Sequence, residues 1–179
     1  MANRMLWRYG DTYPVVAFVR NVHTIEIGDL VYGERDAAGL YTLPASEVND
    51  QGTIAINQKW FKCKFLGVAM QQHRPSHDPL DVTSIRVATK GTFEFDCASA
   101  LFDIADRVGV AENAAGNALL NQTVIEVPLG DAEIDQRSIG IVQKQVNVAA
   151  TTVYVRITSE LMEAGYEGDT CSGSSSSGE

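Results

Sequence analysis

The chain has 179 residues, 45% of them hydrophobic, and a formal net charge of −9 at pH 7. This length suits one domain or two small halves that share a core. No apolar stretch approaches the ~20 residues of a membrane-spanning helix. The acidic balance argues against direct contact with nucleic acid, because phosphates are bound by clusters of Lys and Arg. Three cysteines without metal-ligand spacing predict reduced thiols, and the absence of a cleavable leader pattern predicts synthesis in a cytoplasm.

Short alternating runs rich in Val, Ile, Thr, Tyr and Phe lie between clusters of Gly, Asn, Asp and Pro, a pattern that predicts β-strands joined by turns. In chain order, strands are expected at residues 12–19, 29–34, 40–43, 53–56, 62–71, 82–88, 91–95, 106–111, 118–120, 124–127, 138–142 and 152–158. Short helical turns are expected at residues 98–104, 131–138 and 160–165. The predicted fold class is therefore all-β.

Two parts of the sequence resemble each other. Residues 25–39 return in pattern at residues 102–116, a shift of 102 − 25 = 77, and further matches join residues 65–69 to 138–142 and 83–87 to 152–157. In both copies an Asx residue stands three positions before a glycine, Asp36 before Gly39 and Asn113 before Gly116, which predicts one equivalent hairpin per copy. We therefore expect a compact β-barrel-like body built by internal duplication, with repeat units at about residues 25–88 and 102–158.

The ends of the chain differ in composition from this body. Residues 1–9 are interpreted as an N-terminal arm, residues 10–161 as the duplicated domain, and residues 162–179 as a Gly/Ser-rich tail that cannot bury enough apolar area to fold alone. The arm carries Arg4, Trp7, Arg8 and Tyr9, residue types that are enriched at interface hot spots. An arm of this kind, on an otherwise acidic chain, is predicted to contact a partner.

The segment Val87-Ala88-Thr89-Lys90-Gly91-Thr92-Phe93-Glu94-Phe95 is followed by further motifs at residues 103–108, 139–142 and 152–157. Together these motifs resemble the capsid cement, or decoration, proteins of tailed bacteriophages, a family long listed as a domain of unknown function and sometimes mislabelled recombinase. The Gly-Asp-x-Val-Tyr element typical of the family is intact at residues 28–32. In the second copy Ala105 stands in place of Gly and Gly109 in place of Tyr, so the turn there is expected to differ.

This resemblance covers residues 10–161 and implies a virion structural protein on the outer surface of an icosahedral head, where it stabilises contacts between capsomers. The implied partners are the major capsid protein and further copies of the chain, with a trimer favoured and a dimer possible. It implies no enzyme activity, no cofactor, no membrane and no direct contact with nucleic acid. The acidic charge agrees with a protein that stays soluble before it docks.

Other candidate residues are weighed against ordinary structural roles. Trp60 and Phe61 lie beside the strand expected at residues 62–71 and are residue types enriched at interfaces. Since adjacent residues on a strand point to opposite faces, one of the two is expected to face away from the barrel core. His73 and His77, followed by Asp78 and Asp81, carry metal-ligand chemistry. Their Pro-containing loop favours a surface that contacts partners, and we expect no metal there.

Two alternatives from other classes remain open at this point. One is a carbohydrate- or receptor-binding module displayed on a particle, which an exposed aromatic platform would favour. The other is a small hydrolase or metalloenzyme centred on His73 and His77. The carboxylate pairs Glu94/Asp96 and Asp131/Glu133 are interpreted as solvated rather than catalytic, and the sequence has no nucleophile-elbow or phosphate-binding motif.

Overall fold

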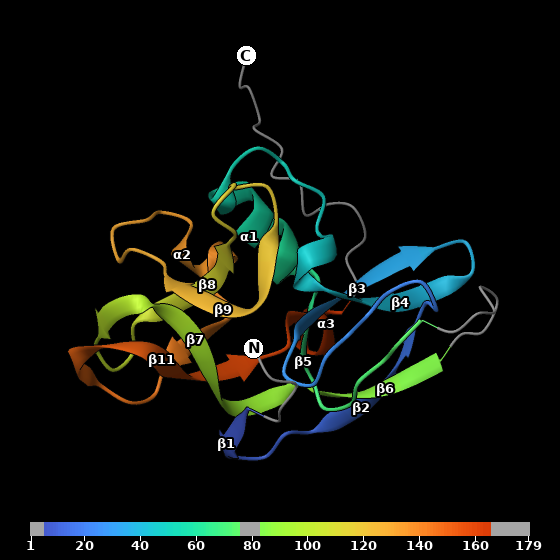
Figure 1. Ribbon diagram of the computed structural model, residues 1–179, viewed down its shortest axis with the longest axis horizontal. Coiled ribbons are helices and arrows are strands. Elements are labelled where there is room, and N and C mark those ends of the chain that lie inside the picture. The colour runs from blue at the N-terminus through green and yellow to red at the C-terminus, as the bar shows by residue number, and fades with distance from the viewer. Residues whose placement is uncertain (1–5, 76–82, 166–179) are drawn as a thin grey trace.

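The computed structural model describes residues 6–75 and 83–165, which form two five-stranded β-barrels side by side with a helix above the line where they meet (Figure 1). The elements are β1 (Trp7–Tyr9), β2 (Pro14–Val19), β3 (Leu30–Asp36), β4 (Gly39–Pro44), η1 (Ala45–Glu47), α1 (Ile54–Cys63), β5 (Phe65–Ala69), β6 (Thr83–Ala88), β7 (Lys90–Phe102), β8 (Arg107–Glu112), β9 (Leu119–Glu126), α2 (Ile134–Arg137), β10 (Gly140–Val142), β11 (Val146–Thr158) and α3 (Glu160–Ala164). The all-β, barrel-like fold class is thus confirmed.

The two barrels have the same strand order. Barrel 1 closes in the order β2-β4-β3-β5-β6, and barrel 2 closes as β7-β9-β8-β10-β11 through the additional pairing of β7 with β9. In each, the first strand runs parallel to the third and antiparallel to the fifth. The helix of each half, α1 or α2, precedes the fourth strand. Outside this shared plan, β1 adds to β7 at the edge of barrel 2.

Strand register is also shared. Three residue pairs of barrel 1 each have a counterpart in barrel 2. Val31↔Gly67 corresponds to Val108↔Gly140, Ala69↔Val87 corresponds to Val142↔Val155, and Val15↔Val87 corresponds to Phe93↔Val155. Gly67 and Gly140 are required by close backbone approach, because an added Cβ would lie 2.0 Å from the Ala88 carbonyl oxygen and 2.4 Å from that of Arg156. One glycine thus occupies the same structural position in both barrels.

The turn before the second strand is the same in both barrels, although its sequence differs. Asp29 Oδ2 accepts a hydrogen bond from Glu26 N at 2.9 Å, and Asp106 Oδ2 accepts one from Asp103 N at 2.7 Å. Gly28 has φ +96°, and Ala105 adopts φ +77° at the equivalent position. The expectation of a different second turn is therefore wrong: the surrounding hydrogen bonds hold alanine in a left-handed conformation that glycine adopts without strain.

The barrels share a core. One cluster of buried side chains unites residues of both, with Tyr32, Phe61 and Phe65 on one side and Phe93 and Phe95 on the other, whereas a smaller cluster fills the interior of barrel 1. Helix α1 bridges the two halves through hydrogen bonds from Gln58 to the Val110 carbonyl oxygen and from Asn57 to Glu112. Neither half therefore buries its apolar surface by itself.

The main local differences from the predicted elements concern α1 and β7. The strand expected at residues 53–56 is instead the start of α1, which Thr53 caps by accepting a hydrogen bond from Ile56 N. Residues 98–102 are not a helical turn but the end of β7, because they pair with β11. Residues 7–9, placed in the arm by sequence, form β1. Among the described helices, none is long and apolar enough to cross a membrane.

The cysteines also differ from expectation. Cys97 is a buried free thiol, whereas Cys63 is disulfide-bonded, so the prediction of three reduced thiols is wrong. Burial, followed by the nearby charge of Asp96, raises the pKa of the Cys97 thiol. A thiol held in its neutral form is a poor nucleophile, so Cys97 is suited to core packing.

Candidate interaction surfaces

The first candidate surface surrounds β1 and is called the arm surface, formed by Trp7, Arg8, Tyr9, Glu94 and Tyr154. The side chains of Trp7 and Tyr9 are 42% and 46% exposed, although their backbone is fixed by pairing with β7. Arg8 forms an ion pair with Glu94, and its guanidinium carbon lies 5.8 Å from the centre of the Tyr154 ring. Glu94 raises the pKa of Arg8. The arm surface thus presents aromatic and cationic groups on a rigid strand.

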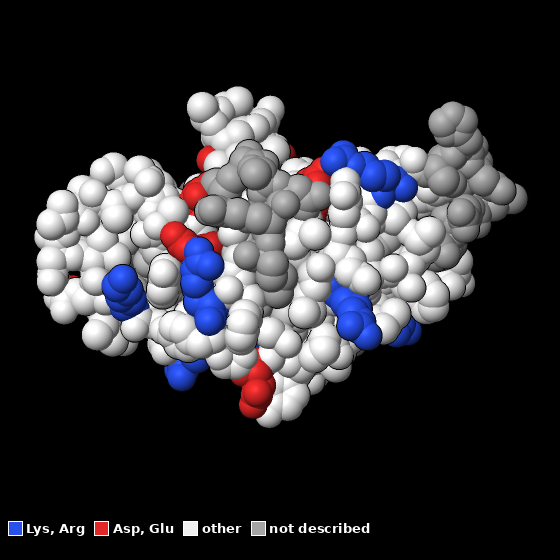
Figure 2. Space-filling model, turned by 60° about the horizontal axis from the view of Figure 1, so that its bottom comes forward, with Lys and Arg blue, Asp and Glu red and all other residues white. Residues whose placement is uncertain are grey.

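Beside the arm surface, a groove of about 500 Å³ runs along β11 and the turn that precedes it, and its walls include Glu94, Lys144 and Tyr154. Lys144 Nζ lies 5.1 Å from the centre of the Tyr154 ring, so two cations, those of Arg8 and Lys144, contact this ring. Figure 2 is turned so that the bottom of Figure 1, where β1 and β2 lie, comes forward. On this face uncharged surface separates scattered charged side chains, and basic groups are prominent despite the acidic net charge.

The structure separates the predicted interface residues. Trp60 and Phe61 lie on α1, not on a strand, because the cap at Thr53 starts a helix. Phe61 is fully buried, and Trp60 is half-buried between an edge contact with Tyr32, 5.2 Å between ring centres, and the ammonium of Lys64, 3.9 Å from its ring. These two side chains therefore support the shared core. Arg4 lies outside the described residues.

His73 is also internal. It is buried, its Nδ1 lies 2.6 Å from the carbonyl oxygen of His23, and its backbone forms a bridge with Ile25. It therefore fixes the loop that leads into β3, and little of its side chain reaches the surface. His77, Asp78 and Asp81 lie outside the described residues. Within residues 6–75 and 83–165, no group of three His, Cys, Asp or Glu side chains is placed to hold a metal ion.

The carboxylate pairs considered from sequence are largely engaged by cations. Glu94 pairs with Arg8, Glu133 with Lys59 and Asp131 with Arg137. These carboxylates therefore have structural partners within the protein, as expected of groups that hold the fold together.

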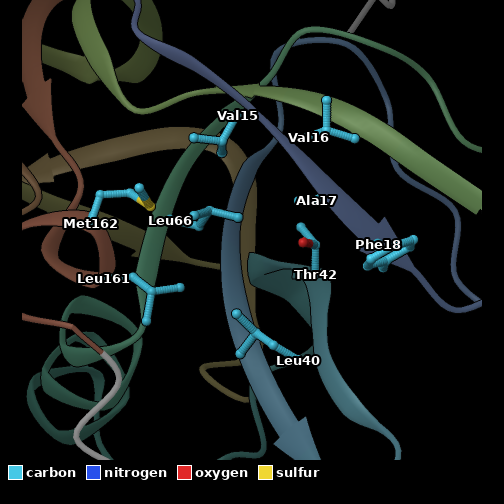
Figure 3. Close-up of a pocket in the computed structure, with 9 residues that line it drawn as sticks. All are labelled: Val15, Val16, Ala17, Phe18, Leu40, Thr42, Leu66, Leu161 and Met162. Carbon is cyan, nitrogen blue, oxygen red and sulfur yellow. The ribbon is translucent and has the colours of Figure 1, made fainter.

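The second candidate surface is an apolar groove in barrel 1, called the barrel 1 groove (Figure 3). Its volume is about 370 Å³, and it is lined by Val15, Val16, Ala17, Phe18, Leu40, Thr42, Leu66, Leu161 and Met162. It opens because β2 and β4 are paired only at Val19 and Thr42 and diverge from that point. Leu161 of α3 covers part of the resulting seam and packs into the interior of barrel 1.

Sequence reasoning did not identify the barrel 1 groove. The available signal was the unbroken apolar run of residues 14–19, in which both strand faces are apolar. A strand at the surface of a small barrel normally alternates between apolar and polar side chains, and this run does not. The seam itself depends on pairing between strands and has no local sequence signal.

Comparisons with known proteins add one similarity. No protein-family model matches the chain, and no curated protein matches it. Among solved structures, the chain is similar to the crystal structure of the head fiber gp8.5 N base in bacteriophage phi29, with 12% sequence identity and a TM-score of 0.42. The similarity covers 81% of this chain and 94% of that chain. A similarity of this degree carries no functional inference.

Proposed function

We propose that this chain is a non-enzymatic structural protein of a bacteriophage virion, which binds the outer surface of the head as a capsid cement protein. The sequence motifs that resemble the cement family motivate the proposal. The observation that carries it is the arm surface, where exposed aromatic and cationic side chains are fixed to a rigid barrel in a chain of net charge −9. Rigid aromatic and Arg side chains are the groups that dominate protein–protein interfaces.

The proposal includes self-association on the capsid. A cement protein that bridges several capsomers gains avidity, since each further contact becomes intramolecular once the first has formed. Closed symmetry is the usual arrangement of such assemblies, and a trimer at three-fold or quasi-three-fold positions is the favoured form. The major capsid protein is the proposed partner of the arm surface.

Binding to heads that lack this protein tests the proposal. We expect the double variant Trp7→Ser and Tyr9→Ser to bind at least roughly ten-fold more weakly in co-sedimentation, because truncation of aromatic hot spots commonly costs that much or more. The matched control is Ile104→Ser with Leu129→Ser, two exposed apolar residues that do not belong to the arm surface. Quantitative mass spectrometry of purified particles should find the protein at a fixed ratio to the major capsid protein. Absence from particles would overturn the proposal.

A second candidate function is a carbohydrate- or receptor-binding module displayed on a particle. It is favoured by Trp7, Tyr9 and Tyr13, three exposed aromatic residues close together in sequence. Aromatic rings contribute large apolar faces with polar edges, which suits sugar rings. Titration of the protein with host-surface glycans, followed by tryptophan fluorescence, separates the two functions: saturable quenching that Trp7→Ser abolishes would favour this one.

A further inference from the structure

Within the described part of the chain, no strand pairs with the edge of β2 that faces the barrel 1 groove until Val19 is reached. Val16 stands opposite Arg86 of β6, but the Arg86 N–H donates to Gln71 Oε1 at 2.9 Å and its carbonyl oxygen accepts from Met70 N at 2.8 Å. Opposite residues in an antiparallel pair exchange both hydrogen bonds or neither. The N–H and C=O of Val16 therefore point away from β6, toward the seam, where β4 pairs with β2 only at Val19.

In barrel 2 the equivalent seam is filled. The shared register makes Val16 equivalent to Glu94, and the Glu94 N–H donates to the carbonyl oxygen of Leu6 at 2.9 Å. Leu6 directly precedes β1, which runs antiparallel to β7, and its side chain is buried in the shared core. One barrel of the molecule thus shows what fits the seam: an extended segment with an apolar side chain pointing inward.

The barrel 1 groove has room for an apolar side chain of the same kind. Leu40, Leu66 and Leu161 form an apolar lining beneath the seam, as Figure 3 shows, and its volume of about 370 Å³ exceeds a single leucine side chain. The groove is lined by β2 on one side and by Leu40 of β4 and Leu161 of α3 on the other. An extended segment can enter it and use the free N–H and C=O of Val16.

The side chains beside the two seams differ in charge, and this difference indicates which kind of segment fits beside β2. On β7 the outward side chains are Glu94 and Asp96, and Glu94 pairs with Arg8 of β1. At the equivalent positions of β2 stand Val16 and Phe18, 69% and 59% exposed. Natural proteins guard free strand edges with charges, and β2 lacks them. An uncharged, apolar side chain therefore fits beside Val16, where barrel 2 has Arg8.

We propose that the barrel 1 groove binds an extended, apolar segment of a partner protein, which adds antiparallel to β2 as β1 adds to β7. A second copy of this chain is a poorer occupant, because its own β1 is already placed in barrel 2 and each copy carries a net charge of −9. The site differs from the arm surface, and its existence does not depend on where the protein acts.

The test uses the full-length protein and a synthetic peptide of its residues 3–9 with Arg8→Val, flanked by lysines for solubility. By NMR, saturating peptide is expected to shift the resonances of residues 15–18 and to slow amide exchange at Val16 and Phe18 by roughly ten-fold or more. The same peptide with Leu6→Asp is expected to cause neither change. This control alters only the peptide, so the protein keeps its original sequence and fold. The protein variant Val16→Glu with Phe18→Asp, which restores the charges found on β7, is expected to bind the first peptide at least roughly ten-fold more weakly.

A matched control places the same charges elsewhere, with Leu129→Glu and Val148→Asp at exposed positions of barrel 2, and should bind like the original chain. Three results would overturn the proposal. The first is no binding, or equal binding of the Leu6→Asp peptide. The second is slow exchange at Val16 and Phe18 before peptide is added, which would mean that the chain itself fills the groove. The third is a concentration-dependent dimer that Val16→Glu with Phe18→Asp abolishes, which would make a second copy the occupant.

Discussion

The two barrels share strand order, register and turns, yet their seams are closed differently. In barrel 2 a strand from outside the repeat, β1, lies beside β7, and Leu6 enters the core. In barrel 1 a helix from outside the repeat, α3, places Leu161 in the interior and leaves a groove beside β2. The repeat therefore supplies a scaffold, while the extensions at the two ends of the described chain decide which surfaces are open to partners.

The comparison also shows which parts of the repeat tolerate change. At one position both barrels keep glycine, Gly67 and Gly140, because a carbonyl oxygen fills the space of a Cβ. At another, Gly28 is replaced by Ala105 without loss of the turn. Backbone contact is thus a stricter constraint here than backbone conformation alone, because a clash displaces a paired strand, whereas a left-handed alanine costs only about 1–2 kcal/mol.

The largest effect is expected at the two equivalent glycines. Gly67→Ala and Gly140→Ala should each lower the free energy of unfolding by about 3 kcal/mol or more, since β5 or β10 must move away from its partner strand. Urea denaturation measures this. Gly130→Ala, with no atom within 4 Å of the added Cβ, is the control and should change stability little. A small loss of stability at either glycine would contradict the structural equivalence of the two positions.

The next prediction concerns the two residues that close the seams. Leu6→Ala should lower the free energy of unfolding by about 3 kcal/mol, and Leu161→Ala should lower it by about 2 kcal/mol. The second value is smaller because Leu161 borders an open groove, so water and neighbouring side chains can fill the space that the substitution leaves. Both values come from denaturation of the full chain. If Leu161→Ala proved the more damaging change, barrel 1 would be the more tightly closed of the two, contrary to the difference described above.

Exchanging the turn residues is expected to have a smaller effect of opposite sign in the two barrels. Gly28→Ala should destabilise by about 1 kcal/mol, because alanine is strained at positive φ. Ala105→Gly should stabilise by less than about 1 kcal/mol, since relief of strain is partly offset by the greater freedom of glycine in the unfolded chain. Thermal unfolding of the two variants, measured together, checks the signs. Destabilisation by Ala105→Gly would contradict the strain at Ala105.

The smallest effect is a pH dependence at Asp29, whose counterpart in barrel 2 is Asp106. Burial raises the pKa of Asp29 above its ordinary value of 3.8, and hydrogen bonds from Glu26 N and Gln122 offset part of the rise. A raised folded-state pKa means that the folded protein binds the proton more tightly than the unfolded chain. The stability linked to Asp29 is therefore greatest below about pH 3.8 and is lost as pH rises through the folded-state pKa.

The stability of the original chain relative to the Asp29→Asn variant should accordingly fall as pH rises from 3.8 toward neutrality. Denaturation at several pH values measures the difference. The half-buried Asp106 provides the control, as Asp106→Asn. A difference that grows with pH would mean that the hydrogen bonds of Asp29 outweigh its burial.

The sequence by itself determined the all-β class, the position of most strands and the repeated pattern that makes Asp106 equivalent to Asp29, because alternation, turn residues and repetition can be read from the residues alone. It did not predict that the turn at Asp106 keeps the conformation of the turn at Asp29. It also identified the exposed aromatic residues of β1. It did not predict α1, since the cap at Thr53 competes with a short apolar run that suits either a helix or a strand.

Only the tertiary structure decided the surfaces. Phe61 and His73 are interface candidates by residue type, but packing against Tyr32 and the hydrogen bond to His23 bury them. The barrel 1 groove arises where β2 and β4, about 20 residues apart in sequence, pair at one point and diverge, and no local pattern encodes that divergence. The physical reason is that a surface is what packing leaves uncovered, and this depends on contacts between segments distant in sequence.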